Sequence, residues 1–268
     1  PSEFPKDWVI LSGILQRCDH YASWIEENQE NEKYFEDIEI TPETSSVIFE
    51  KIETFLKDKT LIKSSAPLIW QIEKIKNNNL QEKNVILVAP TGYGKTEFAF
   101  LWASGSKFFY TLPLESAVKQ IFERTSKIFN SPKEKTGILY SDAALYLTER
   151  SKNDYEESIR TYELSRNLSY PAIISTGDQF FPYALKCPGY ERIFATLSYS
   201  KLIIDEVQAY DPRACAIIVK FIEYMHKLNS KFLLMTATLP NFVKKAIEER
   251  IGKNYDEINI YEEEKEFL

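Results

Sequence analysis

Short runs of β-branched and aromatic residues recur along the chain, and each is followed by a stretch in which apolar residues recur at helical spacing. Six runs are long enough to form strands, and they cover residues 84–89, 107–112, 136–140, 171–176, 201–206 and 231–238. Because consecutive positions are apolar, both faces of each strand should be buried, which is typical of a parallel sheet covered by helices. The pattern therefore predicts an α/β fold with a doubly wound, mostly parallel sheet.

The ends of two helices can be predicted from their flanking residues. Asp211 followed by Pro212 indicates an N-cap and a first turn, so a helix should cover residues 212–229. A second helix should begin at Asn241 and end at Gly252, a residue type that commonly terminates helices.

The first 60 residues follow a different pattern. Residues 8–27 and 45–57 are predicted to form amphipathic helices, and the acidic run over residues 26–40 separates them. We therefore expect two parts, a helical extension over residues 1–60 and an α/β domain over residues 61–268.

Composition excludes some classes of protein. The net charge of −7 argues against a protein coated with nucleic acid, although it says little about one local groove. The three cysteines lack the spacing of a metal site or a disulfide framework, which favours a reducing, cytoplasmic environment. No apolar run approaches the roughly 18 residues of a membrane span, so we expect no membrane partner.

The octapeptide APTGYGKT follows the first predicted strand and opens a helix. In such a loop the backbone N–H groups of Gly92, Tyr93 and Gly94 can point at an anion, and the helix N-terminus adds partial positive charge. Lys95 would then reach the β and γ phosphates, and the Thr96 hydroxyl would bind Mg²⁺. The loop predicts a site for ATP and Mg²⁺.

Two later strands also end in polar residues. Asp205 and Glu206 should face the same crevice as the loop, because ligands of open α/β sheets bind at the carboxyl ends of strands. Asp205 would hold Mg²⁺ through water, and Glu206 would polarise the attacking water. Thr236 and Thr238 end the next strand and could hydrogen-bond toward the acidic pair, reporting whether the γ phosphate is present.

A phosphate loop, an acidic pair and a Thr-Ala-Thr turn in this order resemble the first RecA-like domain of superfamily 2 helicases. Gln71 lies 24 residues before Lys95, like the glutamine of the family's Q motif, which implies that it reads adenine. Within the superfamily, the segments APTGYGKTEFAF, TLPLESAVKQIFER, ISTGDQFFPYAL and IIDEVQAYDP resemble the CRISPR-associated helicase-nuclease of type I systems. Gln208 replaces the histidine usual in that family, and because glutamine also donates and accepts hydrogen bonds, coupling to the threonine turn should survive.

The resemblance implies a single-stranded DNA translocase or helicase that takes part in the degradation of invading DNA and is recruited by a CRISPR surveillance complex. ATP would close a cleft between this domain and a second RecA-like domain, which is absent from this chain, and hydrolysis would reopen it. Phosphates of the DNA would be bound through backbone amides, hydroxyls and basic side chains. The residues implied in these contacts are Pro113, Lys119, Gln120, Arg124, Thr176 and Gly177.

Two further expectations follow from the resemblance. Without the arginines of the second domain, the chain alone should bind ATP weakly and hydrolyse it slowly. Residues 1 to about 30 are similar to the end of an HD nuclease domain, in which Asp19 would be a metal ligand. With only His20 and His226 in the chain, a complete HD site cannot form here.

Three other functions remain open from the sequence. An RNA helicase or a restriction-type DNA translocase would carry the same three motifs. A docking module that binds nucleotide without turnover is a third possibility, but such a module would not need Glu206 beside Asp205.

Overall fold

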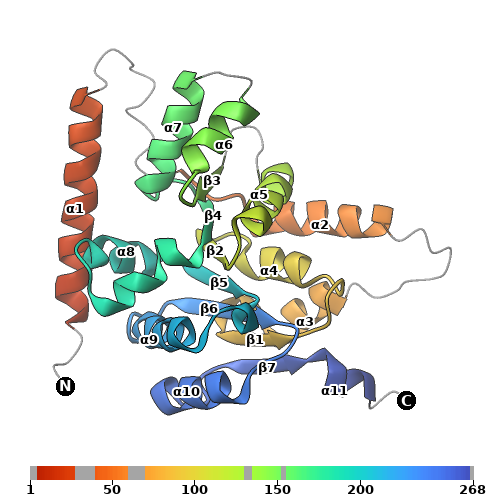
Figure 1. Ribbon diagram of the computed structural model, residues 1–268. Helices are drawn as coiled ribbons and strands as arrows, with labels where there is room; N and C mark the ends of the chain where they lie inside the picture. The colour runs from red at the N-terminus through yellow and green to blue at the C-terminus, as the bar shows by residue number, and fades with distance from the viewer. Residues whose placement is uncertain (1–4, 28–39, 60–69, 130–134, 152–154, 266–268) are drawn as a thin grey trace.

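The computed structural model describes residues 5–27, 40–59, 70–129, 135–151 and 155–265 (Figure 1). Seven strands form one sheet in the order β3-β4-β2-β5-β6-β1-β7, and every pairing within the described residues is parallel. The predicted doubly wound α/β fold is confirmed. The strands are β1 (Val85–Val88), β2 (Phe108–Leu112), β3 (Thr136–Leu139), β4 (Ala172–Thr176), β5 (Lys201–Asp205), β6 (Lys231–Thr236) and β7 (Asp256–Asn259).

Helices cover both faces of the sheet (Figure 1). They are α1 (Lys6–Glu27), α2 (Ser45–Lys59), α3 (Trp70–Asn78), α4 (Lys95–Ala103), α5 (Glu115–Phe129), α6 (Ala143–Arg150), α7 (Tyr155–Arg166), α8 (Tyr190–Leu197), α9 (Pro212–Lys227), α10 (Asn241–Ile251) and α11 (Ile260–Lys265). Both predicted helix ends are found. The Asp211 carboxylate accepts hydrogen bonds from the backbone N–H groups of Arg213 and Ala214, and α10 ends before Gly252, whose φ is 65°.

The strands divide their side chains between two apolar cores. Val85 and Leu87 of β1 belong to the core formed with α4 and α5, whereas Ile86 and Val88 belong to the core formed with α8, α9 and α10. Successive side chains of a strand point to opposite faces, so one uninterrupted apolar run supplies both cores. None of the described helices is long and apolar enough to cross a bilayer.

The N-terminal helices pack against the α/β domain. Helix α1 lies along α8 (Figure 1), and a Cβ atom at Gly13 would lie 2.1 Å from the carbonyl oxygen of Glu191. Only glycine permits this close approach. Helix α2 packs against α4 and α5. The proposed boundary near Leu61 lies outside the described residues.

An ion-pair cluster joins α9 to α10. The buried carboxylate of Glu223 lies 2.7 Å from Nζ of Lys227, 2.9 Å from Nζ of Lys220 and 2.9 Å from Nη1 of Arg250. Burial raises the pKa of Glu223, but the hydrogen bonds from Lys227 and Lys220 together outweigh burial and lower the pKa to about 2.

This pKa predicts a pH-dependent contribution to stability. Because the pKa is lower in the folded than in the unfolded chain, the contribution should be complete above about pH 5 and decline as the pH falls toward 2. Glu223→Gln should lower the free energy of unfolding by about 2 kcal/mol at pH 7 and by less at pH 3. Urea unfolding followed by circular dichroism measures both values, with Glu149→Gln, exposed on α6, as the control. A loss of the same size at pH 7 and pH 3 would contradict the prediction.

Candidate nucleotide-binding site

Three neighbouring strands bring the predicted motifs to one edge of the sheet. The phosphate loop follows β1, Asp205 ends β5 and Thr236 ends β6, which lies between β5 and β1. The Lys95 ammonium is 3.3 Å from Oε1 of Glu206. The loop and the acidic pair therefore face the same crevice.

The phosphate loop has the backbone conformation that its glycines permit. Gly92 and Gly94 have φ values of 86° and 79°, in the left-handed region that favours glycine. Gly94 is also the N-cap of α4, so the helix N-terminus faces the loop. Lys95 is 8% exposed, and its Nζ donates a hydrogen bond to the carbonyl oxygen of Ala89 at 3.2 Å. The loop thus presents amides, a helix terminus and an ammonium group to an anion.

Helix α3 contacts the phosphate loop through two side-chain hydrogen bonds. Nε2 of Gln71 and Nε1 of Trp70 both donate hydrogen bonds to the carbonyl oxygen of Tyr93, at 3.3 and 3.2 Å. The Trp70 ring stacks on Phe98 of α4 with 5.6 Å between centroids. Gln71 is buried, and a Cβ atom at Gly94 would lie 2.2 Å from its Nε2. The structure places Gln71 beside the phosphate loop; its reading of adenine stays a prediction.

Asp205 has one occupied and one free carboxylate oxygen. Its Oδ2 accepts a hydrogen bond of 2.7 Å from the hydroxyl of Tyr110, whereas its buried Oδ1 has no hydrogen-bond partner. Burial raises the pKa of Asp205 to about 6 and the Glu206 carboxylate adds to this rise, while the bond from Tyr110 and the charge of Lys95 oppose it.

A divalent cation would satisfy this free oxygen and offset the cost of burying the Asp205 charge. Oxygen ligands from a carboxylate and a hydroxyl suit Mg²⁺, and Thr96 follows Lys95 at the start of α4. Asp205 and Thr96 therefore fit the predicted magnesium site.

A chain of side-chain contacts connects the phosphate loop to β6. Glu206 accepts a hydrogen bond from Nε2 of Gln208, and Oε1 of Gln208 accepts one from the hydroxyl of Thr236. The same hydroxyl lies 2.7 Å from the carbonyl oxygen of Thr238. Glu206 has a φ of 55°, which is uncommon for a residue other than glycine, and its backbone N–H bonds the carbonyl oxygen of Met235 at 2.9 Å. Gln208 thus donates a hydrogen bond to Glu206 and accepts one from Thr236.

The phosphate loop, Gln71, Asp205 and Glu206 line a cavity of about 1140 Å³, which also extends to α5 through Gln120 and Arg124. Its size is sufficient for a nucleotide, because small-molecule sites typically enclose several hundred Å³.

The residues implied in DNA contacts fall into two groups. Pro113 and Gly177 directly follow Leu112 and Thr176, which are paired neighbours at the ends of β2 and β4. The hydroxyl of Thr176 is buried and has no hydrogen-bond partner. These segments lie together at the carboxyl edge of the sheet.

The basic residues of α5 have other neighbours. The Lys119 ammonium lies 5.4 and 5.2 Å from the ring centroids of Tyr140 and Tyr146. Arg124 forms an ion pair with the buried Glu97 of α4. Positions five residues apart differ by about 140° around a helix, so the two side chains leave α5 on different faces.

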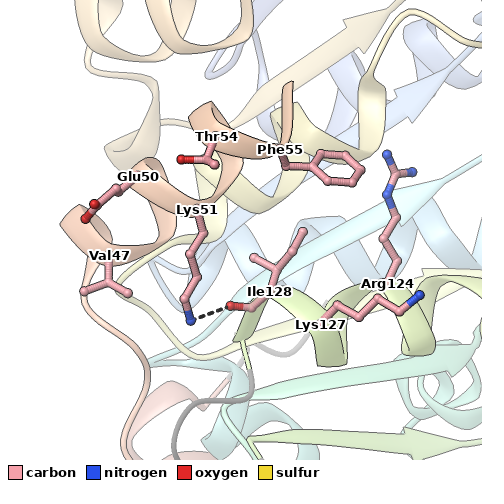
Figure 2. A pocket seen from close by; sticks show the side chains of 8 residues that line it. All are labelled: Val47, Glu50, Lys51, Thr54, Phe55, Arg124, Lys127 and Ile128. Atoms are coloured by element: carbon pink, nitrogen blue, oxygen red, sulfur yellow. Dashed lines mark hydrogen bonds between the residues drawn. The ribbon is translucent and has the colours of Figure 1, made fainter. Parts of the chain in front are cut away.

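Figure 2 shows Arg124 again at a second cavity of about 580 Å³ between α2 and α5, with its guanidinium 5.7 Å from the ring centroid of Phe55. Lys51 of α2 closes the other side of this cavity by donating a hydrogen bond to the carbonyl oxygen of Ile128 at 3.0 Å. Within the described chain, Arg124 is therefore engaged in joining α2, α4 and α5. Its role toward DNA stays a prediction.

Asp19 is exposed on α1. No group of three or more His, Cys, Asp or Glu side chains within the described ranges could hold a metal ion. The assignment of Asp19 as a ligand in an intact HD domain stays untested.

Tyr110 and Glu97 belong to the site but were not predicted from the sequence. Tyr110 is fully buried, and burial followed by the charge of Asp205 raises its pKa, so the hydroxyl keeps its proton and donates to the carboxylate. The available signal in the sequence was a phenol within the apolar run KFFYTL. A buried hydroxyl normally requires a hydrogen-bond partner.

Comparisons with known proteins identify relatives over the part of the chain that contains this site. The DEAD/DEAH box helicase family matches residues 71–246, which include the phosphate loop, the acidic pair and the threonine turn. The CRISPR-associated nuclease/helicase Cas3 of Methanothermobacter thermautotrophicus is 33% identical over 255 residues, which cover 92% of this chain and 28% of that protein. The putative Cas3 of Methanocaldococcus jannaschii is 26% identical over 89% of this chain and 34% of its own length. The chain thus spans about a third or less of these relatives.

Solved structures support the fold. The crystal structure of T. fusca Cas3-ADP superposes with a TM-score of 0.61 at 19% identity, covering 80% of this chain and 25% of that one. A hypothetical ATP-dependent RNA helicase from Sulfolobus tokodaii gives a TM-score of 0.55 at 22% identity, covering 78% of this chain and 56% of that one. The RecA-like fold and the resemblance to CRISPR-associated helicase-nucleases are both confirmed. By the family match over residues 71–246, this chain belongs to the DEAD/DEAH box helicases.

Proposed function

We propose that this chain is the ATP-binding half of a single-stranded DNA translocase or helicase that acts in type I CRISPR interference. The observation that carries the proposal is the line of contacts from Lys95 through Glu206 and Gln208 to Thr236, because it connects the phosphate loop to a neighbouring strand end. The names of the relatives, CRISPR-associated nuclease/helicases, support a role in CRISPR systems. Recruitment by a CRISPR surveillance complex is part of the proposal and follows from the sequence resemblance.

The residues divide the chemistry among themselves. Mg²⁺, when bound, neutralises charge on the β and γ phosphates. Thr96 and Asp205 would hold it, and the amides of the loop would bind the phosphate oxygens. Glu206 would orient the attacking water as its base.

The ion pair between Lys95 and Glu206 implies that nucleotide binding precedes the action of Glu206 as a base. While Lys95 lies 3.3 Å from Oε1 of Glu206, the ion pair engages the carboxylate that would contact the attacking water. When Lys95 turns to the phosphates, Glu206 is released to accept a proton from water. Binding of the triphosphate would thereby prepare the base for hydrolysis.

The carboxyl edge of the sheet supports a DNA track. Pro113, Thr176 and Gly177 lie together at neighbouring strand ends, with Pro113 partly exposed and the Thr176 hydroxyl buried without a hydrogen-bond partner. Contacts from backbone groups and hydroxyls bind the phosphates of a strand without reading its sequence. A second RecA-like domain would complete the track and supply arginines to the γ phosphate, so we expect weak turnover by the chain alone.

The choice between DNA and RNA decides between this proposal and an RNA helicase. In protein that carries both RecA-like domains, single-stranded DNA should raise the ATPase rate at least tenfold, and RNA of the same length should raise it far less. A coupled ATPase assay with matched DNA and RNA oligonucleotides measures this difference. Equal or stronger activation by RNA would favour the RNA helicase. No activity with either nucleic acid would favour the docking module.

A further inference from the structure

Tyr110 lies beside the strand that carries Asp205. In the register of β2 and β5 it is paired with Ile203, and Asp205 is two residues further along β5 on the same face. The Tyr110 ring is fully buried and packs edge-on against Phe100, with 6.2 Å between centroids. Its hydroxyl therefore has little freedom, and it donates a hydrogen bond of 2.7 Å to Oδ2 of Asp205.

The two oxygens of Asp205 are consequently different. Oδ2 is held by Tyr110, whereas Oδ1 is buried without a hydrogen-bond partner. A buried carboxylate oxygen without a partner is costly, and a ligand that binds there removes the cost. Rotation about the last side-chain bond of aspartate is soft, so the carboxylate would not by itself hold one oxygen toward the crevice.

We propose that Tyr110 is a positioning residue that orients the Asp205 carboxylate so that Oδ1 faces Mg²⁺ and its water shell. The inference rests on the proposed function, because it concerns the same ATP–Mg²⁺ site. Groups that hydrogen-bond to a metal ligand commonly change metal affinity by 10- to 100-fold when they are removed. Tyr110→Phe deletes only the hydroxyl and keeps the ring in the core, so it removes the contacts that this hydroxyl makes with Asp205 and with Thr96, the other residue expected to hold Mg²⁺.

The test separates nucleotide binding from metal binding. Binding of a fluorescent methylanthraniloyl-ADP to the chain is titrated first in EDTA and then at rising Mg²⁺ concentrations. For Tyr110→Phe we expect an affinity within about twofold of the unmodified chain in EDTA. The Mg²⁺ concentration that gives half of the increase in ADP affinity should rise about tenfold. Tyr170→Phe removes a hydroxyl that is equally buried but adjoins the opposite end of β4, and it should leave both values unchanged.

Each other outcome would overturn the inference. An unchanged Mg²⁺ midpoint in Tyr110→Phe would show that the hydroxyl does not orient the ligand. Loss of ADP binding in EDTA as well would place the role of the hydroxyl in folding of the strand. Failure of the proposed function is recognised separately, because the unmodified chain would then show no tightening by Mg²⁺.

Discussion

Lys95→Ala should weaken the binding of nucleotide and Mg²⁺ by at least about a hundredfold. The Lys95 ammonium lies between the carbonyl oxygen of Ala89 in the phosphate loop and the Glu206 carboxylate. Among the described residues that line the cavity, no other side-chain cation lies between the loop and Glu206. Charge-assisted hydrogen bonds contribute about 1.5–3 kcal/mol each, and about 2.7 kcal/mol corresponds to a hundredfold change in the dissociation constant. Removing the lysine also leaves Glu206 as an uncompensated negative charge facing the phosphates.

Titration of fluorescent methylanthraniloyl-ADP in Mg²⁺ measures this effect. Lys83→Ala is the matched control, because Lys83 lies at the opposite end of β1 and pairs with Asp256 at 2.8 Å. The control should bind as the unmodified chain does. If the affinity of Lys95→Ala were within twofold of that of the unmodified chain, the phosphate loop would not be part of the nucleotide site.

Glu206→Gln should leave nucleotide binding intact and slow hydrolysis by about 10²–10⁴-fold, the usual contribution of a general base. The amide has nearly the shape of the carboxylate and can still accept the hydrogen bond from Gln208, but it cannot take a proton from water. Nucleotide affinity should be unchanged or higher, because one negative charge near the phosphates is lost.

Single-turnover hydrolysis in protein with both RecA-like domains separates this prediction from a binding defect. Glu82→Gln, exposed at the far edge of the sheet, should hydrolyse at the unmodified rate. If Glu206→Gln hydrolysed at that rate too, another group would be the base, and the ion pair with Lys95 would have only a structural role.

The strands could be predicted because burial on both faces leaves a clear signal. The runs that contain β1, β2, β5 and β6 are apolar at nearly every position, and the structure buries them in the middle of the sheet. β7 was missed because Asp256–Asn259 is an edge strand with one neighbour and three polar residues in four. Its pairing with β1 is a tertiary contact, and nothing in its own composition favours a strand.

The candidate site, too, could be predicted only in part from the sequence. Lys95, Asp205 and Glu206 belong to motifs whose spacing fixes them at strand ends, so topology alone brings them together. The directions of Lys119 and Arg124 depend on how α5 is rotated against α4 and α6, which helical periodicity cannot define. Tyr110 was hidden because an aromatic residue within an apolar strand is most often only part of the core.

Thr236 has a single hydroxyl proton but two acceptors, Oε1 of Gln208 and the carbonyl oxygen of Thr238. Because the two acceptors share this proton, a stronger bond to the glutamine weakens the bond to the turn. A rotation of the hydroxyl is therefore enough to exchange one bond for the other without displacing a strand. A change in the hydrogen bonding of Gln208 would thereby alter the turn at Thr238 without moving a strand.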